Sequence, residues 1–241
     1  MVIGVALVEP RHHFNVGYVA RIMKNFGLTN MFTINASFNK EEAVKFATHG
    51  KDILASAQSI SLKQLRENFD ILIGTTALCA TSRLNIVRDS ISPTQLSDII
   101  RKSANRKNFC IILGREASGL VNSELEICDL IVIINTKTMY TTMNISHALA
   151  ILLYEISKNQ NEILIPERRR NKKLASKQEL DLLVYYVSKL ALVSNYDKHK
   201  EPMLRLAIRR VLARALPTSK ETMLLVSLVR KSLLKIGRES R

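Results

Sequence analysis

Short apolar runs alternate with helix-prone segments along the first 158 residues. Five runs have the length and the apolar content of buried strands, and they cover residues 2–8, 31–35, 70–74, 109–113 and 130–134. Helix-prone segments lie between most of them. This alternation predicts an α/β domain with a mainly parallel sheet and helices on both of its faces.

The helical segments have recognisable ends. The first carries an apolar stripe at helical spacing, formed by Val16, Val19, Ala20, Met23 and Phe26. Asn15 is expected to cap this helix, and Gly27 to end it. Arg21 lies about 140° round the helix from Val16, so it faces a loop or the solvent. Further helices are expected over residues 41–58, 93–102 and 145–156, the last with Asn144 as its N-cap.

Polar segments follow three of the predicted strands. They are Thr75-Thr76-Ala77, Gly114–Leu120 and Asn135–Asn144. Because parallel strands bring their carboxyl ends to one edge of a sheet, the last two segments are expected to wall a single pocket there. Glycines in the first wall would let the backbone approach a ligand closely.

The character of the chain changes after residue 158. Residues 159–175 form a polar, basic linker that contains Arg168, Arg169 and Arg170. Residues 176–241 contain three helical segments, expected over 177–192, 203–215 and 219–236, with Ser219 as a cap and Leu224, Leu225, Leu228 and Leu233 on an apolar face. A bundle of about 60 residues has a marginal core, so it is expected to pack on the first domain or on a second copy of the chain.

Charge is distributed unevenly along the 241 residues, whose formal net charge is +15. Residues 1–154 hold 16 Lys and Arg against 12 Asp and Glu, a net of +4, whereas residues 155–241 hold 20 against 9, a net of +11. This asymmetry favours a polyanionic partner such as a nucleic acid. The alternative is a basic solvated surface that binds nothing.

Cysteine usage and the first residues suggest a reducing compartment. Cys79, Cys110 and Cys128 lack metal-ligand spacing and no histidine cluster accompanies them, so neither a zinc site nor a disulfide framework is expected. The opening MVIGVALVEP has no basic segment, and its apolar run is too short for a signal peptide or a membrane span. We therefore expect a cytoplasmic protein without a metal.

Three segments resemble motifs of a known family. They are VALVEPRHHFNVGYVARIMKNFGL near the start, LGREASGL from Leu113, and IVIINTKTMYTTMNISHALAILLYEI from Ile131. In this order, over about 155 residues, they resemble the three motifs of the SpoU branch of the SPOUT RNA 2′-O-methyltransferases. The opening V-E-P and the helical C-terminal extension are most similar to the TrmJ type, which methylates nucleotide 32 of the tRNA anticodon loop.

The resemblance implies a fold, a cofactor and a partner. It implies that roughly residues 110–155 are threaded into a trefoil knot, which threading rules alone would reject. It implies S-adenosyl-L-methionine as the methyl donor, S-adenosyl-L-homocysteine as the product, tRNA as the substrate and a homodimer whose sites involve both protomers. The residues assigned to the cofactor are Thr75, Thr76, Ala77, Gly114, Glu116, Ile134, Thr141, Thr142, Met143 and Asn144.

Family resemblance also assigns residues to catalysis and to RNA. Arg21 matches an active-site arginine, and Asn15 and Thr142 are expected to assist it. An arginine normally keeps its proton, so Arg21 is expected to bind a phosphate and the 2′-oxygen, with the proton acceptor left open. The chain departs from bacterial relatives at Leu78, where they have an arginine. Arg83 and Arg88 are the two candidates to replace it, and the expected RNA contacts are Arg83, Arg88, Arg168, Arg169 and Arg170.

Three other functions remain open at this stage. The chain could methylate another tRNA or rRNA ribose, or it could be an RNA-binding module that has lost its chemistry. The third, a nucleotide-utilising Rossmann enzyme, is disfavoured because no G-x-G-x-x-G follows the first strand and no G-x-x-x-x-G-K-[ST] occurs.

Overall fold

The chain divides into two compact units, Met1–Leu164 and Ile165–Arg241. The computed structural model describes residues 1–78, 87, 89–103, 106–136, 138, 140–158 and 173–239, with the backbone alone for 237–239. The predicted RNA contacts Arg83, Arg88, Arg168, Arg169 and Arg170 lie outside the described residues, as does most of the expected linker.

Among the described residues of the first unit, six parallel strands form one sheet. Their order is β3-β2-β1-β5-β4-β6, with bounds β1 (Ile3–Val8), β2 (Met31–Ile34), β3 (Gln58–Ser59), β4 (Ile71–Thr76), β5 (Phe109–Leu113) and β6 (Leu130–Ile133). Every residue of the central strands β1 and β5 is buried, as expected where helices cover both faces. The predicted α/β class and parallel sheet are confirmed, and five strands lie where the apolar runs placed them.

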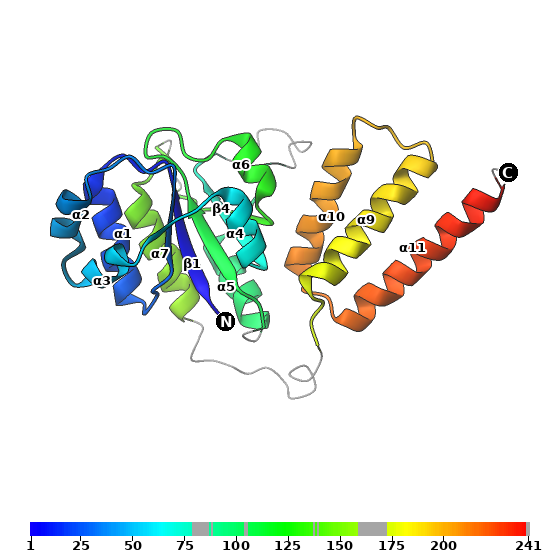
Figure 1. Ribbon diagram of the computed structural model, residues 1–241, viewed down its shortest axis with the longest axis horizontal. Helices are drawn as coiled ribbons and strands as arrows, with labels where there is room; N and C mark the ends of the chain where they lie inside the picture. The colour runs from blue at the N-terminus through cyan, green and yellow to red at the C-terminus, as the bar shows by residue number, and fades with distance from the viewer. Residues whose placement is uncertain are drawn as a thin grey trace. The chain divides into compact units, whose positions relative to one another are not determined.

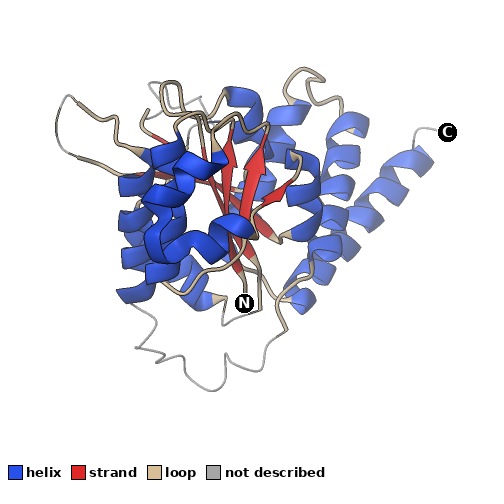
Figure 2. Ribbon diagram, turned by 60° about the vertical axis from the view of Figure 1, so that its left-hand side comes forward, coloured by secondary structure: helices blue, strands red, loops and turns tan. Residues whose placement is uncertain are grey.

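Helices cover both faces of this sheet. Their bounds are α1 (His13–Asn25), α2 (Lys40–Ala47), the 3₁₀ turn η1 (Thr48–Gly50), α3 (Lys51–Ala55), α4 (Leu62–Asn68), α5 (Pro93–Lys102), α6 (Asn122–Ile127) and α7 (Ile145–Lys158). Helix α1 packs on α2, α3 and α7, whereas α4 and α6 contact β4. In Figure 1, α1, α2 and α7 lie on one side of the strands and α4 and α6 on the other, and Figure 2 shows the strands enclosed by helices.

The predicted N-cap of the first helix is wrong. Helix α1 begins at His13 with His12 as its N-cap, and no side chain caps it. Asn15 is the third residue of the helix and is only 2 % exposed. Its amide bonds two distant side chains instead, a role that local spacing cannot reveal.

The single helix expected over residues 41–58 is also wrong. Thr48 has a φ of 47° and opens a 3₁₀ turn between α2 and α3. This turn brings Gly50 so close to α1 that a Cβ there would lie 2.6 Å from the carbonyl oxygen of Ala20. Packing against α1 therefore divides the helix, and Gln58 pairs with Phe32 as the start of β3.

The second unit contains three described helices, α9 (Lys177–Val193), α10 (Glu201–Ala215) and α11 (Ser219–Glu239). Helix α9 packs on both others, around a small core of Leu183, Val184, Leu212 and Val226. The expected cap Ser219 is wrong: it is the first residue of α11, and the hydroxyl of Thr218 accepts the amide hydrogen bond of Glu221 at 3.3 Å.

The apolar residues predicted on the last helix are largely exposed. Leu224 and Leu228 are each 62 % exposed and Leu225 is 46 % exposed, while Val226 and Thr222 face the core. None of the helices in the described ranges combines the length and apolar content needed to cross a membrane.

Candidate active site

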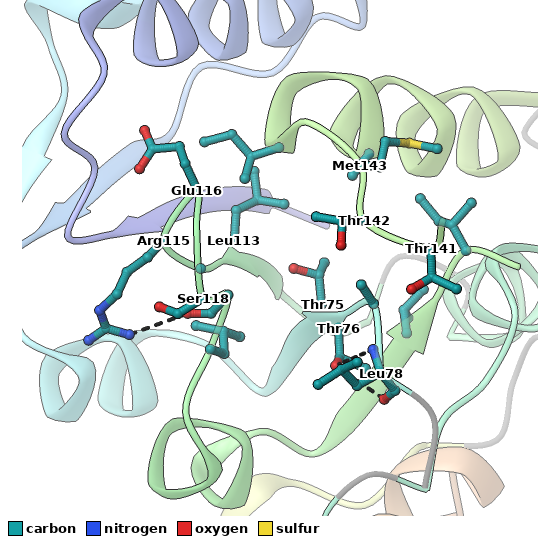
Figure 3. Close-up of a pocket in the computed structure, with 18 of the residues that line it drawn as sticks. Thr75, Thr76, Leu78, Leu113, Arg115, Glu116, Ser118, Thr141, Thr142 and Met143 are labelled. Carbon is teal, nitrogen blue, oxygen red and sulfur yellow. Dashed lines mark hydrogen bonds between the residues drawn. The ribbon is translucent and has the colours of Figure 1, made fainter. Parts of the chain in front are cut away.

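A cavity of about 370 Å³ lies at the carboxyl ends of the neighbouring strands β5, β4 and β6. Its walls come from the end of β4, the loop after β5, and the end of β6 with the loop that leads into α7. Figure 3 shows Thr75 and Thr76 on β4, with Thr141, Thr142 and Met143 on the loop opposite them. Its position is the one at which parallel α/β sheets bind ligands, and its size is typical of a small-molecule site.

Most residues assigned to the cofactor line this cavity. They are Thr75, Thr76, Ala77, Gly114, Glu116, Ile134, Thr141, Thr142 and Met143, joined by residues that the sequence did not single out, such as Ala148 and Leu152. Asn144, Asn15 and Arg21 are described but lie outside the wall. The site residues therefore separate into a cavity lining and a group on and beside α1.

The loop after β5 is closed tightly on itself. Arg115 and Gly119 exchange backbone hydrogen bonds of 3.2 and 2.9 Å, and Gly119 has a φ of 67°. A Cβ on Gly114 would lie 2.2 Å from the carbonyl carbon of Gly119, closer than any real contact. Both glycines are therefore required for a loop that presents its backbone to the cavity.

Arg115 fixes this loop from behind. Its guanidinium makes two hydrogen bonds of 2.8 Å to the carboxylate of Glu9, which follows β1, and bonds of 2.9 and 3.0 Å to the carboxylate of Glu124 on α6. Glu124 also accepts the amide hydrogen of Val121 at 2.8 Å. The hydrogen bond and charge of Arg115 lower the pKa of Glu9, and the two carboxylates raise the pKa of Arg115. The guanidinium of Arg115 therefore stabilises the conformation of the loop.

A second polar network joins all three motif segments. The Asn144 amide donates to the Asn15 side-chain oxygen at 2.7 Å, and the Asn15 amide donates to Glu116 at 3.3 Å. Asn144 itself accepts bonds from the backbone amide and the hydroxyl of Ser146, at 2.8 and 2.7 Å. Asn144 therefore caps α7 as predicted, while Asn15 fixes α1 between the two loops of the cavity.

Glu116 is kept ionised by its surroundings. Burial would raise its pKa, but hydrogen bonds from its own backbone amide, from the His12 amide and from Asn15 outweigh burial and lower the pKa. The His12 bond is 3.1 Å long and ties the start of α1 to the cavity wall. The cavity wall therefore carries the carboxylate of Glu116 and the guanidinium of Arg115, which is paired with Glu9 and Glu124.

The threonine hydroxyls of β4 are already engaged. Thr75 donates to the carbonyl oxygen of Ile112 on the adjacent strand at 3.1 Å. Thr76 accepts from the Leu78 amide at 3.1 Å and donates to the Leu78 carbonyl at 3.3 Å. These hydroxyl groups can offer a ligand acceptor lone pairs, but their hydrogens are already used.

Arg21 is exposed on α1, on the side of the helix away from the apolar stripe, as its spacing predicted. The stripe residues Val16, Val19, Ala20 and Met23 are completely buried.

Cys110 and Cys128 are buried thiols, and burial raises the pKa of Cys110. Within the described ranges, no group of three or more His, Cys, Asp or Glu side chains is placed to hold a metal ion.

Comparison with known proteins agrees with this geometry. Residues 3–154 match the model of the SpoU rRNA Methylase family. The chain is 33 % identical over 234 residues to the tRNA (cytidine-2′-O-)-methyltransferase TrmJ of Methanocaldococcus jannaschii. The aligned region covers 94 % of this chain and 98 % of that protein.

Two solved structures share the fold. The crystal structure of TrmJ from Z. mobilis ZM4 superimposes with a TM-score of 0.67 at 19 % identity, over 96 % of this chain and 99 % of that one. The SpoU methyltransferase AviRb from Streptomyces viridochromogenes, solved in complex with the cofactor AdoMet, gives a TM-score of 0.51 at 14 % identity, over 67 % and 58 % of the two chains. With its family motifs gathered round one cavity at the carboxyl edge of a parallel sheet, the chain belongs to the SpoU rRNA methylase family.

Proposed function

We propose that this protein is an S-adenosyl-L-methionine-dependent tRNA ribose 2′-O-methyltransferase that acts on cytidine, or uridine, at position 32 of the anticodon loop. The observation that carries the proposal is the cavity between the loops at 114–120 and 141–143, in a chain that resembles a tRNA cytidine 2′-O-methyltransferase along nearly its whole length. Position 32 rests on the likeness of the motifs and extension to the TrmJ type.

The cavity suits the methyl donor. Backbone at Gly114 and apolar side chains at Ile134 and Met143 would contact the adenosine part of S-adenosyl-L-methionine. The bound cofactor supplies an electrophilic methyl group, and S-adenosyl-L-homocysteine remains afterwards. The tight glycine loop allows the close backbone approach that such a ligand needs.

The protein then has to orient a ribose hydroxyl and stabilise the charge that develops on its oxygen. We assign Arg21 to the 2′-oxygen and the adjoining phosphate, because a guanidinium keeps its proton and binds such oxygens well. Asn15 fixes the helix that carries Arg21, and we assign Thr142, which lies on the cavity wall, to assist Arg21. Removal of the hydroxyl proton is assigned to no residue.

A homodimer completes this site in our proposal. Arg21 is exposed and does not line the cavity of its own chain, so an arginine from a second copy would bring the ribose site and the cofactor site together. We assign residues 1–158 to the catalytic domain, 159–175 to a basic linker, and 176–241 to RNA binding and dimer support. The trefoil knot over 110–155 and the cytoplasmic location stay predictions.

Mass spectrometry of nucleosides tests the reaction. Unmodified tRNA transcripts would be incubated with the protein and methyl-labelled S-adenosyl-L-methionine, and then digested. We expect label in 2′-O-methylcytidine or 2′-O-methyluridine, and fragment mapping should place it at position 32. Label at another tRNA or rRNA position would select a different ribose. Absence of label, with RNA binding retained, would leave a non-catalytic RNA-binding module.

Calorimetry tests the cofactor separately. S-adenosyl-L-methionine and S-adenosyl-L-homocysteine should bind, whereas NAD and ATP should not. A preference for either nucleotide would contradict the assignment of the cavity.

A further inference from the structure

Five aromatic rings contact one another on the surface of the first unit, at the start of α1. The ring of His12 stacks on that of Phe14, with centroids 5.2 Å apart and planes 16° apart, and His13 touches both Phe14 and Phe46. Phe46 on α2 also packs edge-on against Phe14 and Tyr18. We call these five residues, His12, His13, Phe14, Tyr18 and Phe46, the aromatic cluster.

Packing between α1 and α2 explains only part of this cluster. A Cβ on Gly17 would lie 2.6 Å from the Cβ of Phe46. Phe46 therefore packs closely against α1 at the glycine. By contrast, His12 is exposed and Tyr18 is 38 % exposed, while Phe14 is half-buried. Rings that remain accessible beyond the helix contact are available to a planar ligand.

The aromatic cluster shares a helix face with Arg21. Tyr18 lies four residues after Phe14 and Arg21 lies seven, so the three side chains are within about 60° of one another round α1. The backbone amide of His12 also bonds Glu116, which lines the cavity. The cluster therefore shares a helix with the residue assigned to the ribose, and its first residue is hydrogen-bonded to the wall of the cofactor cavity.

We propose that the aromatic cluster stacks an unpaired base of the RNA substrate next to the ribose held by Arg21. This inference rests on the proposed function, which supplies the RNA. Single-stranded RNA is bound in general by aromatic rings that stack its bases, together with cations that contact its phosphates. Arg11 and Arg21, both exposed, supply cations before and after the α1 rings in sequence.

Two acidic residues lie near the rings: Glu116, which accepts hydrogen bonds from the His12 backbone amide and from Asn15, and Glu42. Glu42 faces His13 and has a lowered pKa, chiefly because Lys45 donates a hydrogen bond to it at 2.6 Å. Its charge is therefore offset within the same helix. The cluster accordingly offers an approaching polyanion rings and cations.

The test is a double-mutant cycle between the rings and the RNA bases. The protein variant is His12→Ala/Phe14→Leu, which removes the stacked ring pair but keeps the backbone and most of the apolar volume. The RNA variants are tRNA transcripts with one abasic residue at each anticodon-loop position in turn. Loss of the stacked base should weaken binding to the parent protein by about 5- to 150-fold at one position. The variant should bind that transcript and the intact one with equal affinity.

Three controls keep the result specific. Tyr154→Leu removes an aromatic residue that is 57 % exposed on α7, and it should leave the effect of every abasic position unchanged. The single variant His12→Ala changes an exposed side chain, so a smaller coupling should survive there even if Phe14→Leu disturbs folding. Molecular mass and melting temperature would be measured on the same samples.

The outcomes separate this proposal from the proposed function. Parent and variant that respond equally at every abasic position overturn the stacking surface, whether or not tRNA is methylated. A variant that becomes monomeric while its parent is dimeric shows instead that the rings join two copies, which also overturns it. Coupling at one position without methyl transfer would retain the stacking surface and contradict the proposed activity.

Discussion

Polar side chains are used differently in the two units of this chain. In the first unit, the polar residues of the motifs are locked to one another: Arg115 bonds two carboxylates, and Asn15 links Glu116 to Asn144 across more than 100 residues of sequence. In the second, residues 165–241 hold 19 Lys and Arg against 7 Asp and Glu, and the described part of this unit forms three helices round a small core. Fixed geometry suits chemistry and an excess of cations suits attraction of a polyanion, so the difference supports a division of labour.

The largest effect should come from Arg21→Ala. It removes the group assigned to the developing negative charge, so single-turnover methyl transfer to tRNA should fall by at least about 100-fold. Affinity for S-adenosyl-L-methionine should be nearly unchanged, because Arg21 does not line the cavity. Lys24→Ala, one turn further along α1 and paired with Asp52, is the matched control and should be nearly as fast as the parent. Near-normal transfer by Arg21→Ala would remove it from the mechanism.

The second largest effect should come from a substitution in the core of the second unit, which is expected to affect tRNA binding but not cofactor binding. Leu183 is 3 % exposed, and Leu183→Ala should reduce the free energy of unfolding of the second unit by about 2–5 kcal/mol. Hydrogen exchange would localise the loss, tRNA affinity should fall, and calorimetry should show unchanged cofactor binding. The control is Leu182→Ala at a 38 % exposed neighbour. Loss of cofactor affinity in the Leu183 variant would show that the units are not independent.

Gly114→Ala should have a smaller effect of the opposite kind, on cofactor binding but not on tRNA binding. The added methyl group overlaps the backbone of Gly119, so the loop must shift at a cost of about 1–3 kcal/mol. Calorimetry should show weaker binding of S-adenosyl-L-methionine, while affinity for tRNA stays close to that of the parent. Val121→Ala, at an exposed residue just after the loop, should alter neither affinity. Unchanged cofactor binding in the Gly114 variant would contradict the assignment of this loop.

The smallest expected effect is on the pH dependence of stability. Glu116 has a folded-state pKa below its ordinary value of 4.5, so its ionised form adds stability above that pH and the contribution is lost as the pH falls through the folded pKa. Denaturation experiments should show a larger free energy of unfolding for the parent than for Glu116→Gln at pH 7. The difference between the two should become smaller below pH 4.5. An advantage that stays constant into acid would show that ionised Glu116 does not hold the network.

The sequence was informative about the sheet and less so about its connections. Apolar runs located β1, β2, β4, β5 and β6 because strands buried on both faces have few polar residues. The strand β3 has only two residues, both exposed, and its pairing with β2 is set by packing elsewhere. The short helix α4 was missed although Ser61 and Gln64 form a capping box, which is a readable signal.

The candidate site was predicted in part. Strand ends and glycines located the cavity, since topology brings those ends together. The partners of Asn15 and the pairing of Arg115 with Glu9 could not be predicted, because these residues lie more than 100 positions apart in sequence and meet only in the finished fold. The available signal for the ion pair of Arg115 with Glu9 was that both charged residues lie just after buried strands. Arg21 was assigned only through the family resemblance.

The division of labour is tested most directly by the salt dependence of tRNA affinity before and after removal of residues 160–241. Cofactor binding and molecular mass would be measured on the same samples. For the full chain, log affinity should fall linearly with log salt, by about 0.7 to 0.9 per phosphate contact. The shortened chain should bind S-adenosyl-L-methionine as before, yet bind tRNA more weakly and with a flatter slope. A shortened dimer with unchanged tRNA affinity and unchanged slope would contradict the account.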